Sequence, residues 1–455
     1  MAAIDRHRLT AHLDEERARY ADARPRSRAA ASAAAEHLVG GVPMTWMAKW
    51  AGGFPLVLAG AHGSHLTDLD GHTYVDLTLG DTGAMAGHSP APVVEAIARQ
   101  TSEVGGITAM LPTDDATWVA GELSARFGMA RWSFALSATD ANRWALRLAR
   151  LVTGRPLVAC FAYGYHGTVD ETFVVRAPDG ATLERAGNVA PAVPPAQTTR
   201  AMEWNELATV EAALADEQVA VVITEPALTN IGIVLPEPGF LDGLRGICDR
   251  TGTLLLIDET HTLSAGPGGC TQRWGLQPDL VTLGKSFAGG VPIGAYGLSA
   301  EVTDRLAARV DDTGADLVDV GGVGGTLAGN ALSLAAARAT LGEVLTADAF
   351  EHMEALATRF TEGVQATLDR HEVPWSIVQL GARAEYRFAL PAPRTGTASA
   401  AAGDDEVEEY LHVALANRGV LITPFHNMAL MAPSTTAADV DRHTEAFAEV
   451  VAAIC

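Results

Sequence analysis

Lysine is nearly missing from this 455-residue chain. Of its 32 basic residues, only Lys49 and Lys285 are lysines, and the rest are arginines. A guanidinium group stays protonated in proteins, whereas a lysine amine can lose its proton and act as a nucleophile or base. We therefore treat both lysines as candidates for a chemical role.

Cysteines are few, and long apolar runs are absent. The four cysteines lack C-x-x-C spacing, which indicates neither a disulfide framework nor a zinc site. They are Cys160, Cys248, Cys270 and Cys455. No apolar run reaches the roughly 18 residues of a membrane-spanning helix, and the acidic N-terminal segment is unlike a secretory or organellar leader. We expect a cytoplasmic protein without a metal centre.

Positive charge is also scarce. Lys and Arg total 32 against 55 Asp and Glu, which gives a formal net charge of −23. A surface of this sign repels phosphate backbones and anionic lipid headgroups. With 48% hydrophobic and 19% charged residues, the composition is that of a folded globular protein. The sequence predicts neither a nucleic-acid partner nor a membrane partner.

The N-terminal part combines a helical pattern with a short alternating region. Residues 1–37 are rich in Ala, Arg and Glu, and the stretch from Pro55 alternates around Asp70-Gly71, which is typical of a hairpin turn. Apolar residues spaced as on one helix face are Leu9, Leu13 and Tyr20. Over residues 1–75 we predict a helical arm and a small antiparallel sheet.

Nearly continuous apolar strands alternate with helical stretches in the middle of the chain. They are SFALS, LVACFAY, VAVVITEP, TLLLIDE, LVTLGK and AYGLS. Strands without polar alternation are buried on both faces, which indicates a mainly parallel sheet covered by helices. We predict an α/β fold, with a large domain over residues 76–325 and an α+β lobe over 326–455 that joins the N-terminal part in a smaller lobe. Residues 391–405, rich in turn formers, are predicted to be a surface loop.

Two chemically useful side chains follow neighbouring predicted strands. Lys285 comes directly after LVTLG, and Asp258 ends LLLID. Ligands bind at the carboxyl ends of strands in open α/β sheets, so both side chains are expected in one crevice. A buried ion pair is the structural alternative, but such pairs stabilise a fold little. A lysine that forms a Schiff base and an acid that pairs with a pyridinium nitrogen are the minimal pyridoxal phosphate site.

These motifs resemble a known family. From about residue 40 to the C-terminus the chain is similar to class III aminotransferases of fold type I, and especially to the glutamate-1-semialdehyde aminomutase branch, with several motifs in family order. The resemblance implies pyridoxal 5'-phosphate as cofactor, a seven-stranded type of sheet in the large domain, and Lys285 and Asp258 as the catalytic pair.

The resemblance also implies the residues that hold the cofactor. LSATDAN resembles the segment that opens a phosphate-binding helix, with Ser137, Ala138 and Thr139 at the matching positions and Ala138 in place of the usual glycine. A helix start suits a dianion because its amides are free. FAYGYHG resembles the segment whose aromatic ring, here Tyr165, stacks on the pyridine ring.

Three further positions follow from the same likeness. ITEPALTN implies that Glu225 and Asn230 lie in the cofactor cleft. GGVGGTLAGN implies that the Thr326 hydroxyl binds the phosphate of the neighbouring subunit's cofactor, so we expect a homodimer or a higher assembly. The segment before Thr326 is longer than usual, and either a lid or a surface loop would account for it.

The predicted function is an aminotransferase that moves an amino group from an amine or amino acid to a carbonyl acceptor. The alternative is a glutamate-1-semialdehyde 2,1-aminomutase or a related isomerase. Trp46 takes the position of the arginine that grips the substrate carboxylate in the aminomutase, which favours an apolar amine. His261 could contact substrate or cofactor, and a buried histidine bonded to backbone is the structural alternative. Arg383 or Arg387 could still bind a carboxylate.

Overall fold

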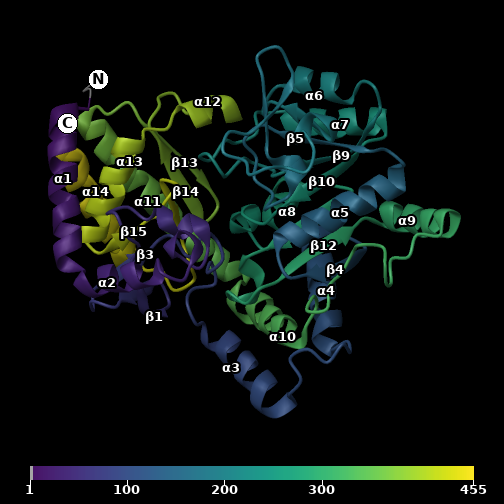
Figure 1. The fold of residues 1–455 in the computed structure, drawn as a ribbon, viewed down its shortest axis with the longest axis horizontal. Helices are drawn as coiled ribbons and strands as arrows, with labels where there is room; N and C mark the ends of the chain where they lie inside the picture. The colour runs from purple at the N-terminus through teal and green to yellow at the C-terminus, as the bar shows by residue number, and fades with distance from the viewer. Residues whose placement is uncertain (1–3) are drawn as a thin grey trace. The chain divides into compact units, whose positions relative to one another are not determined.

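The computed structural model describes residues 4–455, which divide into two compact units (Figure 1). Unit 1 contains the chain up to Pro90 together with Asp348–Pro393 and Ala401–Cys455, and unit 2 contains Ala91–Ala347 and Arg394–Ala400. The sequence analysis predicted domain boundaries after residues 75 and 325. The first boundary falls later because Leu77 still bonds to unit 1, donating to the Leu421 carbonyl at 2.9 Å and accepting from the Leu430 amide at 2.8 Å.

Unit 2 is built on a seven-stranded sheet in the order β4-β12-β11-β10-β9-β5-β8. Only β12 runs antiparallel to its two neighbours, so the predicted mainly parallel sheet is confirmed. The strands are β4 (Arg131–Ala135), β5 (Leu157–Phe161), β8 (Thr199–Met202), β9 (Val219–Thr224), β10 (Leu254–Asp258), β11 (Leu280–Gly284) and β12 (Gly294–Leu298). Strands β9, β10 and β11 are buried along their whole length, as expected of continuous apolar runs.

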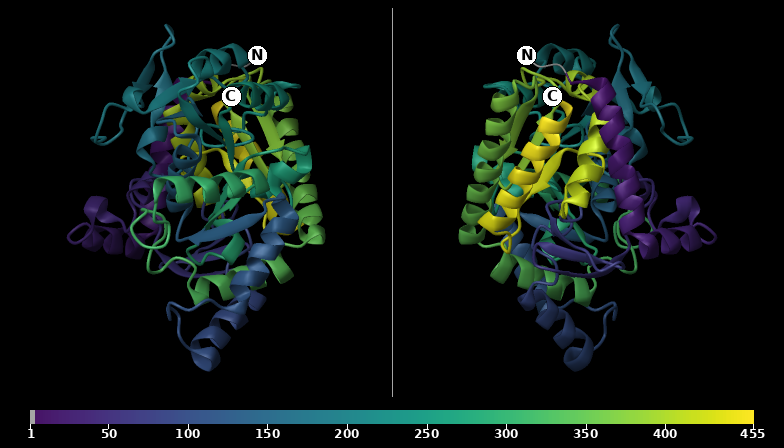
Figure 2. Two further views of the ribbon diagram at one scale, coloured as in Figure 1. Left: turned by 90° about the vertical axis from the view of Figure 1, so that its right-hand side faces the viewer. Right: turned by 90° about the vertical axis from the view of Figure 1, so that its left-hand side faces the viewer.

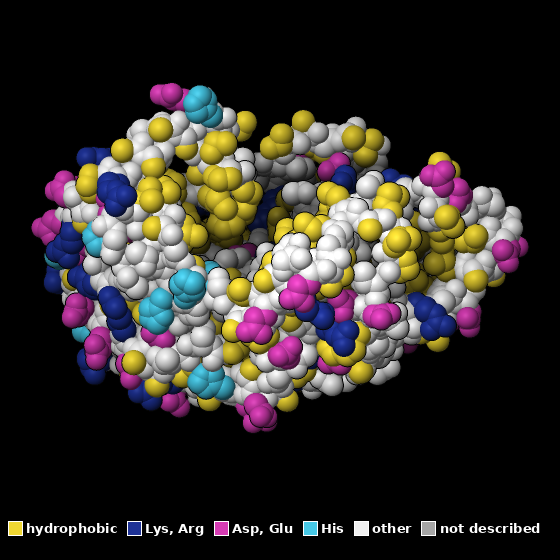
Figure 3. Space-filling model, turned by 90° about the horizontal axis from the view of Figure 1, so that it is seen from below, with side chains coloured by type: hydrophobic (Ala, Val, Ile, Leu, Met, Phe, Trp, Pro, Cys, Tyr) yellow, Lys and Arg dark blue, Asp and Glu magenta, His cyan; other side chains and the backbone are white. Residues whose placement is uncertain are grey.

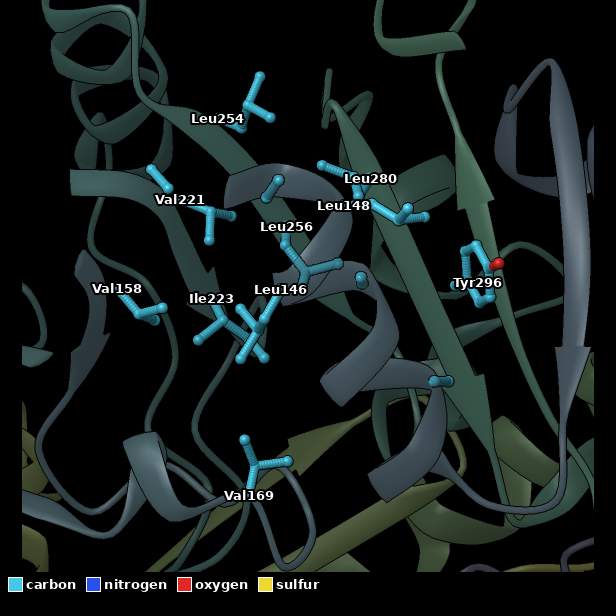
Figure 4. Packing of buried hydrophobic residues seen from close by; sticks show 14 of the residues in the cluster. Leu146, Leu148, Val158, Val169, Val221, Ile223, Leu254, Leu256, Leu280 and Tyr296 are labelled. Carbon is cyan, nitrogen blue, oxygen red and sulfur yellow. The ribbon is translucent and has the colours of Figure 1, made fainter. Parts of the chain in front are cut away.

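Helices cover this sheet and close its core. Alanine and leucine side chains of α5 (Ala138–Thr153) pack on apolar side chains of β9, β10 and β11, as Figure 4 shows for Leu146, Leu256 and Ile223. The other helices of unit 2 are α3 (Ala91–Arg99), α4 (Asp114–Phe127), α6 (Leu207–Leu214), α7 (Phe240–Thr251), α8 (Gly269–Trp274), α9 (Ala300–Thr313), α10 (Ala331–Ala339) and α12 (Gly396–Ala401). The core therefore fixes the carboxyl ends of the central strands.

Several short elements of unit 2 were not predicted. Strand β8 was not expected, because TRAM is short and carries an arginine. The predicted loop 391–405 contains helix α12, whose start is held by Glu203: its carboxylate accepts from the Gly396 amide at 2.9 Å and from the Thr397 hydroxyl. A short hairpin of β6 (Val174–Arg176) and β7 (Thr182–Glu184) completes the unit.

Unit 1 contains two small sheets. The first has the order β1-β2-β3-β15, and the turn at Asp70-Gly71 joins β2 and β3, as predicted. Its strands are β1 (Leu58–His62), β2 (His65–Asp68), β3 (Thr73–Asp76) and β15 (Val420–Leu421). The second sheet is antiparallel and consists of β13 (Ser376–Leu380), β14 (Arg383–Arg387) and β16 (Met428–Leu430).

Five helices pack in unit 1. They are α1 (Arg6–Ala23), α2 (Pro25–Ala34), α11 (Ala347–His371), α13 (Asp405–Asn417) and α14 (Ala437–Ile454). The predicted N-terminal helix is present, and α1 lies along α13 and α14 of the same unit (Figure 2). Its Leu9, Leu13 and Tyr20 are buried, because the apolar face needs a partner within the unit.

Charged side chains of both signs share the described surface. On the face drawn in Figure 3, acidic side chains are interspersed with basic ones instead of leaving a broad basic patch. Across residues 4–455, no helix is both long and apolar enough to cross a membrane, and no group of three or more His, Cys, Asp or Glu is placed to hold a metal ion. All four cysteines are free thiols.

Candidate active site

The carboxyl ends of three parallel strands bring the predicted catalytic groups to one edge of the unit 2 sheet. Asp258 is the last residue of β10, Lys285 follows β11, and Glu225 follows β9. In the β10–β11 register Asp258 lies opposite Thr282, three residues before Lys285. Parallel strands end at the same edge, so an amine and two carboxyl groups meet there.

Asp258 is a buried carboxylate with directed partners. Its Oδ2 accepts hydrogen bonds from Asn142 Nδ2 at 2.8 Å and from His166 Nδ1 at 3.0 Å, and its Oδ1 accepts from the Thr260 amide at 3.0 Å. Burial opposes ionisation, but the hydrogen bond and charge interaction with His166, with further bonds from Thr260 and Asn142, hold the pKa of Asp258 below its ordinary value. The site therefore contains a fixed negative charge.

Lys285 occupies a strained backbone position. Its φ is +58°, in the region that side-chain-bearing residues rarely adopt, and such strain concentrates at functional sites. The preceding Gly284 packs closely against the start of α5. A Cβ on Gly284 would lie only 2.6 Å from the Ala138 Cβ, so a larger residue would clash there. Strand β11 thus delivers the lysine next to a helix N-terminus.

That helix start can receive an anion. Ser137 caps α5, with its Oγ accepting from the Asp140 amide at 3.2 Å. The amides of Ala138 and Thr139 lie in the first turn, where no helical carbonyl precedes them. Thr139 Oγ1 accepts from the Thr168 amide at 3.0 Å and fills the space where a Cβ on Gly167 would lie. The lack of a side chain on Gly167 therefore lets its loop pack closely against Thr139 at the start of the helix.

This donor set fits pyridoxal phosphate. A helix N-terminus suits its phosphate, the ionised Asp258 suits a protonated ring nitrogen, and Lys285 suits its aldehyde. The Ser286 hydroxyl is also buried and has no hydrogen-bond partner in the part of the chain that the structure describes. A buried polar atom of this kind is expected where a bound molecule supplies the partner.

A second hydrogen-bonded group lies beside the lysine. The Lys285 Nζ is 2.5 Å from His261 Nε2, and His261 Nδ1 is 3.0 Å from Thr229 Oγ1. The Thr229 hydroxyl in turn donates to Glu225 Oε2. His261, Thr229 and Glu225 are each almost fully buried. An amine is thus connected to a carboxylate through an imidazole and a hydroxyl.

Three predicted cofactor residues have less defined surroundings. Tyr165 is half-buried and lies edge-on to Phe173, with ring centroids 6.3 Å apart. Asn230 is half-buried in the turn after Thr229. Thr326 is exposed in the turn before α10.

The remaining candidates belong to unit 1. Trp46 lies in a 3-10 helix (Thr45–Lys49) and packs edge-on against Phe425 at 5.1 Å between centroids. Lys49 is exposed, with its Nζ 5.7 Å from the centre of the same ring. Arg383 and Arg387 are buried on β14, and the Arg383 guanidinium donates to Thr82 Oγ1.

Sequence reasoning did not assign Asn142, His166 and Thr229 to the site. Asn142 offered a signal, because it is a polar residue on the face of α5 that carries buried Ala141 and Ala145. His166 directly follows the predicted Tyr165, and Thr229 lies between Glu225 and Asn230. Their partners come from segments far apart in the chain, so spacing alone did not reveal them.

Comparison with known proteins identifies relatives over nearly the whole chain. The model of the family "Aminotransferase class-III" matches residues 46–451. Glutamate-1-semialdehyde 2,1-aminomutase of Chloroflexus aggregans is 34% identical over 442 residues, covering 94% of this chain and 98% of that protein.

Solved structures extend the likeness. A lysine-to-alanine variant of a glutamate-1-semialdehyde-aminomutase from Pseudomonas aeruginosa PAO1, in complex with PMP, is 45% identical, covers 100% of both chains and has a TM-score of 0.96. An omega-transaminase from Sphaerobacter thermophilus is 26% identical, covers 94% of this chain and 97% of that one, and has a TM-score of 0.83. The chain therefore belongs to the class III aminotransferases, pyridoxal phosphate enzymes of fold type I.

Proposed function

We propose that this enzyme moves an amino group within a single substrate, as a glutamate-1-semialdehyde 2,1-aminomutase. The observation that carries the proposal is the likeness over the whole chain, at 45% identity, to the Pseudomonas protein that bears this name. The relatives from Chloroflexus and Sorangium bear the same name. These relatives favour the aminomutase, which the sequence analysis gave as its alternative, over the aminotransferase with two substrates, which was its main prediction.

Lys285 and Asp258 are proposed as the catalytic pair. When bound, pyridoxal phosphate supplies an aldehyde and a ring that withdraws electrons from the carbon next to the amine. Lys285 would hold the cofactor through its Nζ, and as a free amine it would carry a proton between carbon atoms of the substrate and the cofactor. Asp258, kept ionised by His166 and Asn142, holds the ring nitrogen protonated.

The other predicted residues are proposed to hold the cofactor. Ser137, Ala138 and Thr139 present the start of α5 to the phosphate, supported by the free amides of its first turn. Tyr165 covers one ring face, and Glu225 and Asn230 border the ring. Thr326, exposed before α10, is proposed to reach the phosphate of a second subunit, so the active form is a homodimer.

One observation favours an aminotransferase as the second candidate. Trp46 stands where the resemblance expects the carboxylate-binding arginine, and an indole has no charge to balance a buried carboxylate. Arg383 and Arg387 are buried on β14, and Arg383 is engaged by Thr82. A donor with an apolar group in place of that carboxylate would suit Trp46 better.

Product analysis separates the two candidates. The holoenzyme is incubated with glutamate-1-semialdehyde alone, and in parallel with a panel of apolar amines plus a keto acid. Formation of 5-aminolevulinate without a second carbonyl compound, at a kcat/KM above that for every amine, is the expected result. A higher kcat/KM for an apolar amine would replace the proposal by the aminotransferase, and Trp46→Arg should then shift preference toward carboxylated donors.

A further inference from the structure

We propose that His261 accepts a proton from, and returns it to, the Lys285 amine, with Thr229 and Glu225 as positioning residues. The inference deepens the proposed function, because it rests on Lys285 being the lysine that reacts with the cofactor. Its basis is the hydrogen-bonded connection from Lys285 Nζ through His261 and Thr229 to Glu225.

The hydrogen bonds fix the imidazole tautomer. Thr229 has one hydroxyl hydrogen, and it is donated to Glu225 Oε2. Thr229 Oγ1 therefore accepts from His261, so Nδ1 is the protonated ring nitrogen. In the neutral ring Nε2 then carries a lone pair, and this atom is the one 2.5 Å from the Lys285 Nζ. The acceptor is thus aimed at the amine.

The proton transfer is balanced within the chain. The Lys285 ammonium gives one proton to His261 Nε2, which leaves a lone pair on Nζ for attack on a carbonyl carbon and makes the imidazole a cation. Glu225, joined through Thr229, offsets that positive charge in a buried setting. Return of the proton from Nε2 to Nζ restores the starting state, so no other reactant is needed.

Four other titratable groups belong to the segment of His261 or to α8. Asp258 and Glu259 lie on its own segment, and on α8 Cys270 interacts electrostatically with Glu259, Arg273 and Glu225. Asp258 is bound by His166 and Asn142, and Glu259 accepts from the Thr271 hydroxyl at 2.6 Å and the Cys270 amide at 3.1 Å. Glu225 is therefore the carboxylate that hydrogen bonds connect to His261.

The two-lysine composition permits a direct test on the full-length apoenzyme. Lysine labelled with ¹³C at Cε gives two signals, and Lys49→Arg identifies that of Lys285. Two groups that share one proton titrate in two coupled steps. We expect the Lys285 signal to show a main step and a second, smaller step at lower pH, and His261→Gln to remove the smaller step. A single step in the wild-type protein would overturn the proposal.

Recombination with the cofactor tests the transfer itself. The rate at which apoenzyme binds pyridoxal phosphate covalently is followed by absorbance as a function of pH. Near neutral pH, His261→Gln should slow this step about 10²-fold, the scale of general base catalysis. Thr229→Val should slow it about tenfold and Thr229→Ser should restore it, because serine keeps the hydroxyl. An unchanged rate and pH profile in His261→Gln would contradict the role.

A matched control excludes general damage from losing a buried imidazole. His412 is buried in unit 1, with its Nε2 3.3 Å from Asn427 Oδ1, so His412→Gln should leave both measurements unchanged. Neither measurement uses a substrate. If the protein fails the aminomutase assay but Lys285 titrates in two steps, the proposed function is rejected and the role of His261 stands. If the assay succeeds but Lys285 titrates in one step, the role of His261 is rejected and the proposed function stands.

Discussion

Two buried histidines in different regions have opposite surroundings. His261, at the carboxyl end of the unit 2 sheet, has a hydrogen-bonding atom beside each ring nitrogen. His443, in α14 of unit 1, is fully buried beside Phe360 and Phe447, with ring centroids 4.4 Å and 5.6 Å away. Within residues 4–455, neither ring nitrogen of His443 has a hydrogen-bond partner.

The difference separates a polar group used for chemistry from one used for packing. Burial without a partner disfavours the charged form, and it lowers the pKa of His443 from 6.5 to about 3. His443 therefore acts as a neutral flat ring in an aromatic cluster. Around His261 the partners are directed, and they decide which nitrogen faces the lysine. Changes at the sheet edge should alter catalysis, whereas changes in the helices of unit 1 should alter stability.

The largest effect is expected at the lysine of the sheet edge. Lys285→Ala should abolish the covalent link to the cofactor and reduce turnover by at least about 10³-fold, because no nearby amine replaces it. Lys49→Ala, in unit 1, is the matched control and should keep both the covalent link to the cofactor and the turnover rate. Borohydride reduction followed by peptide mapping measures the link, and recovery of the label on Lys49 would contradict the assignment.

Asp258→Asn should retain the cofactor but lose about 10²- to 10³-fold in kcat, because an amide cannot hold the ring-nitrogen proton by charge. Asp279 offers a control at the opposite end of the same strands, where its carboxylate accepts from the Leu255 amide at 2.7 Å and from Arg245 at 2.9 Å. Asp279→Asn should lower stability and leave kcat near normal. Equal losses of kcat in Asp258→Asn and Asp279→Asn would contradict a specific catalytic role for Asp258.

His443 should make the protein less stable in acid. Its pKa is lower in the folded state than in the unfolded state, so the unfolded state binds the proton first and the free energy of unfolding falls as pH drops from 6.5 toward 3. At pH 5 this loss is about 2 kcal/mol relative to pH 7. Urea unfolding at both pH values should show that His443→Leu removes most of it. An equal loss in the variant would show that other groups cause it.

The smallest expected effect is a partial recovery of activity that depends on Thr326, an exposed residue. If Thr326 serves a second subunit, mixing Lys285→Ala and Thr326→Ala proteins creates hybrid dimers with one intact site and one doubly altered site. After complete exchange of subunits, about a quarter of normal activity should return. Absence of any recovery, with exchange demonstrated by differently tagged subunits, would count against a shared site.

The sequence predicted the parts of the fold that depend on continuous patterns. Strands β9, β10 and β11 were expected because their apolar runs are uninterrupted, and their ends located Asp258 and Lys285. Strand β8 and helix α12 were missed because they are short and are held by contacts from other segments, such as Glu203 with Gly396.

The partners of the catalytic groups were harder to predict. Asn142 and His166 reach Asp258 from α5 and from the segment after β5, so only the folded sheet reveals that they converge. The same holds for Thr229, which joins His261 to Glu225. Trp46 was assigned from the resemblance and Arg383 from its place on a predicted strand of the C-terminal lobe, and their substrate role stays a prediction.

The assembly of unit 1 from distant segments affects how the protein is made. Strand β3 pairs with β15, and α1 packs on α13 and α14, yet about 340 residues separate β3 from β15. At roughly 5–20 residues per second, a ribosome needs tens of seconds to supply the later segments. During that interval α1, with Leu9 and Leu13 on its apolar face, lacks α13 and α14, so the first helix is the segment at which we expect a chaperone to bind.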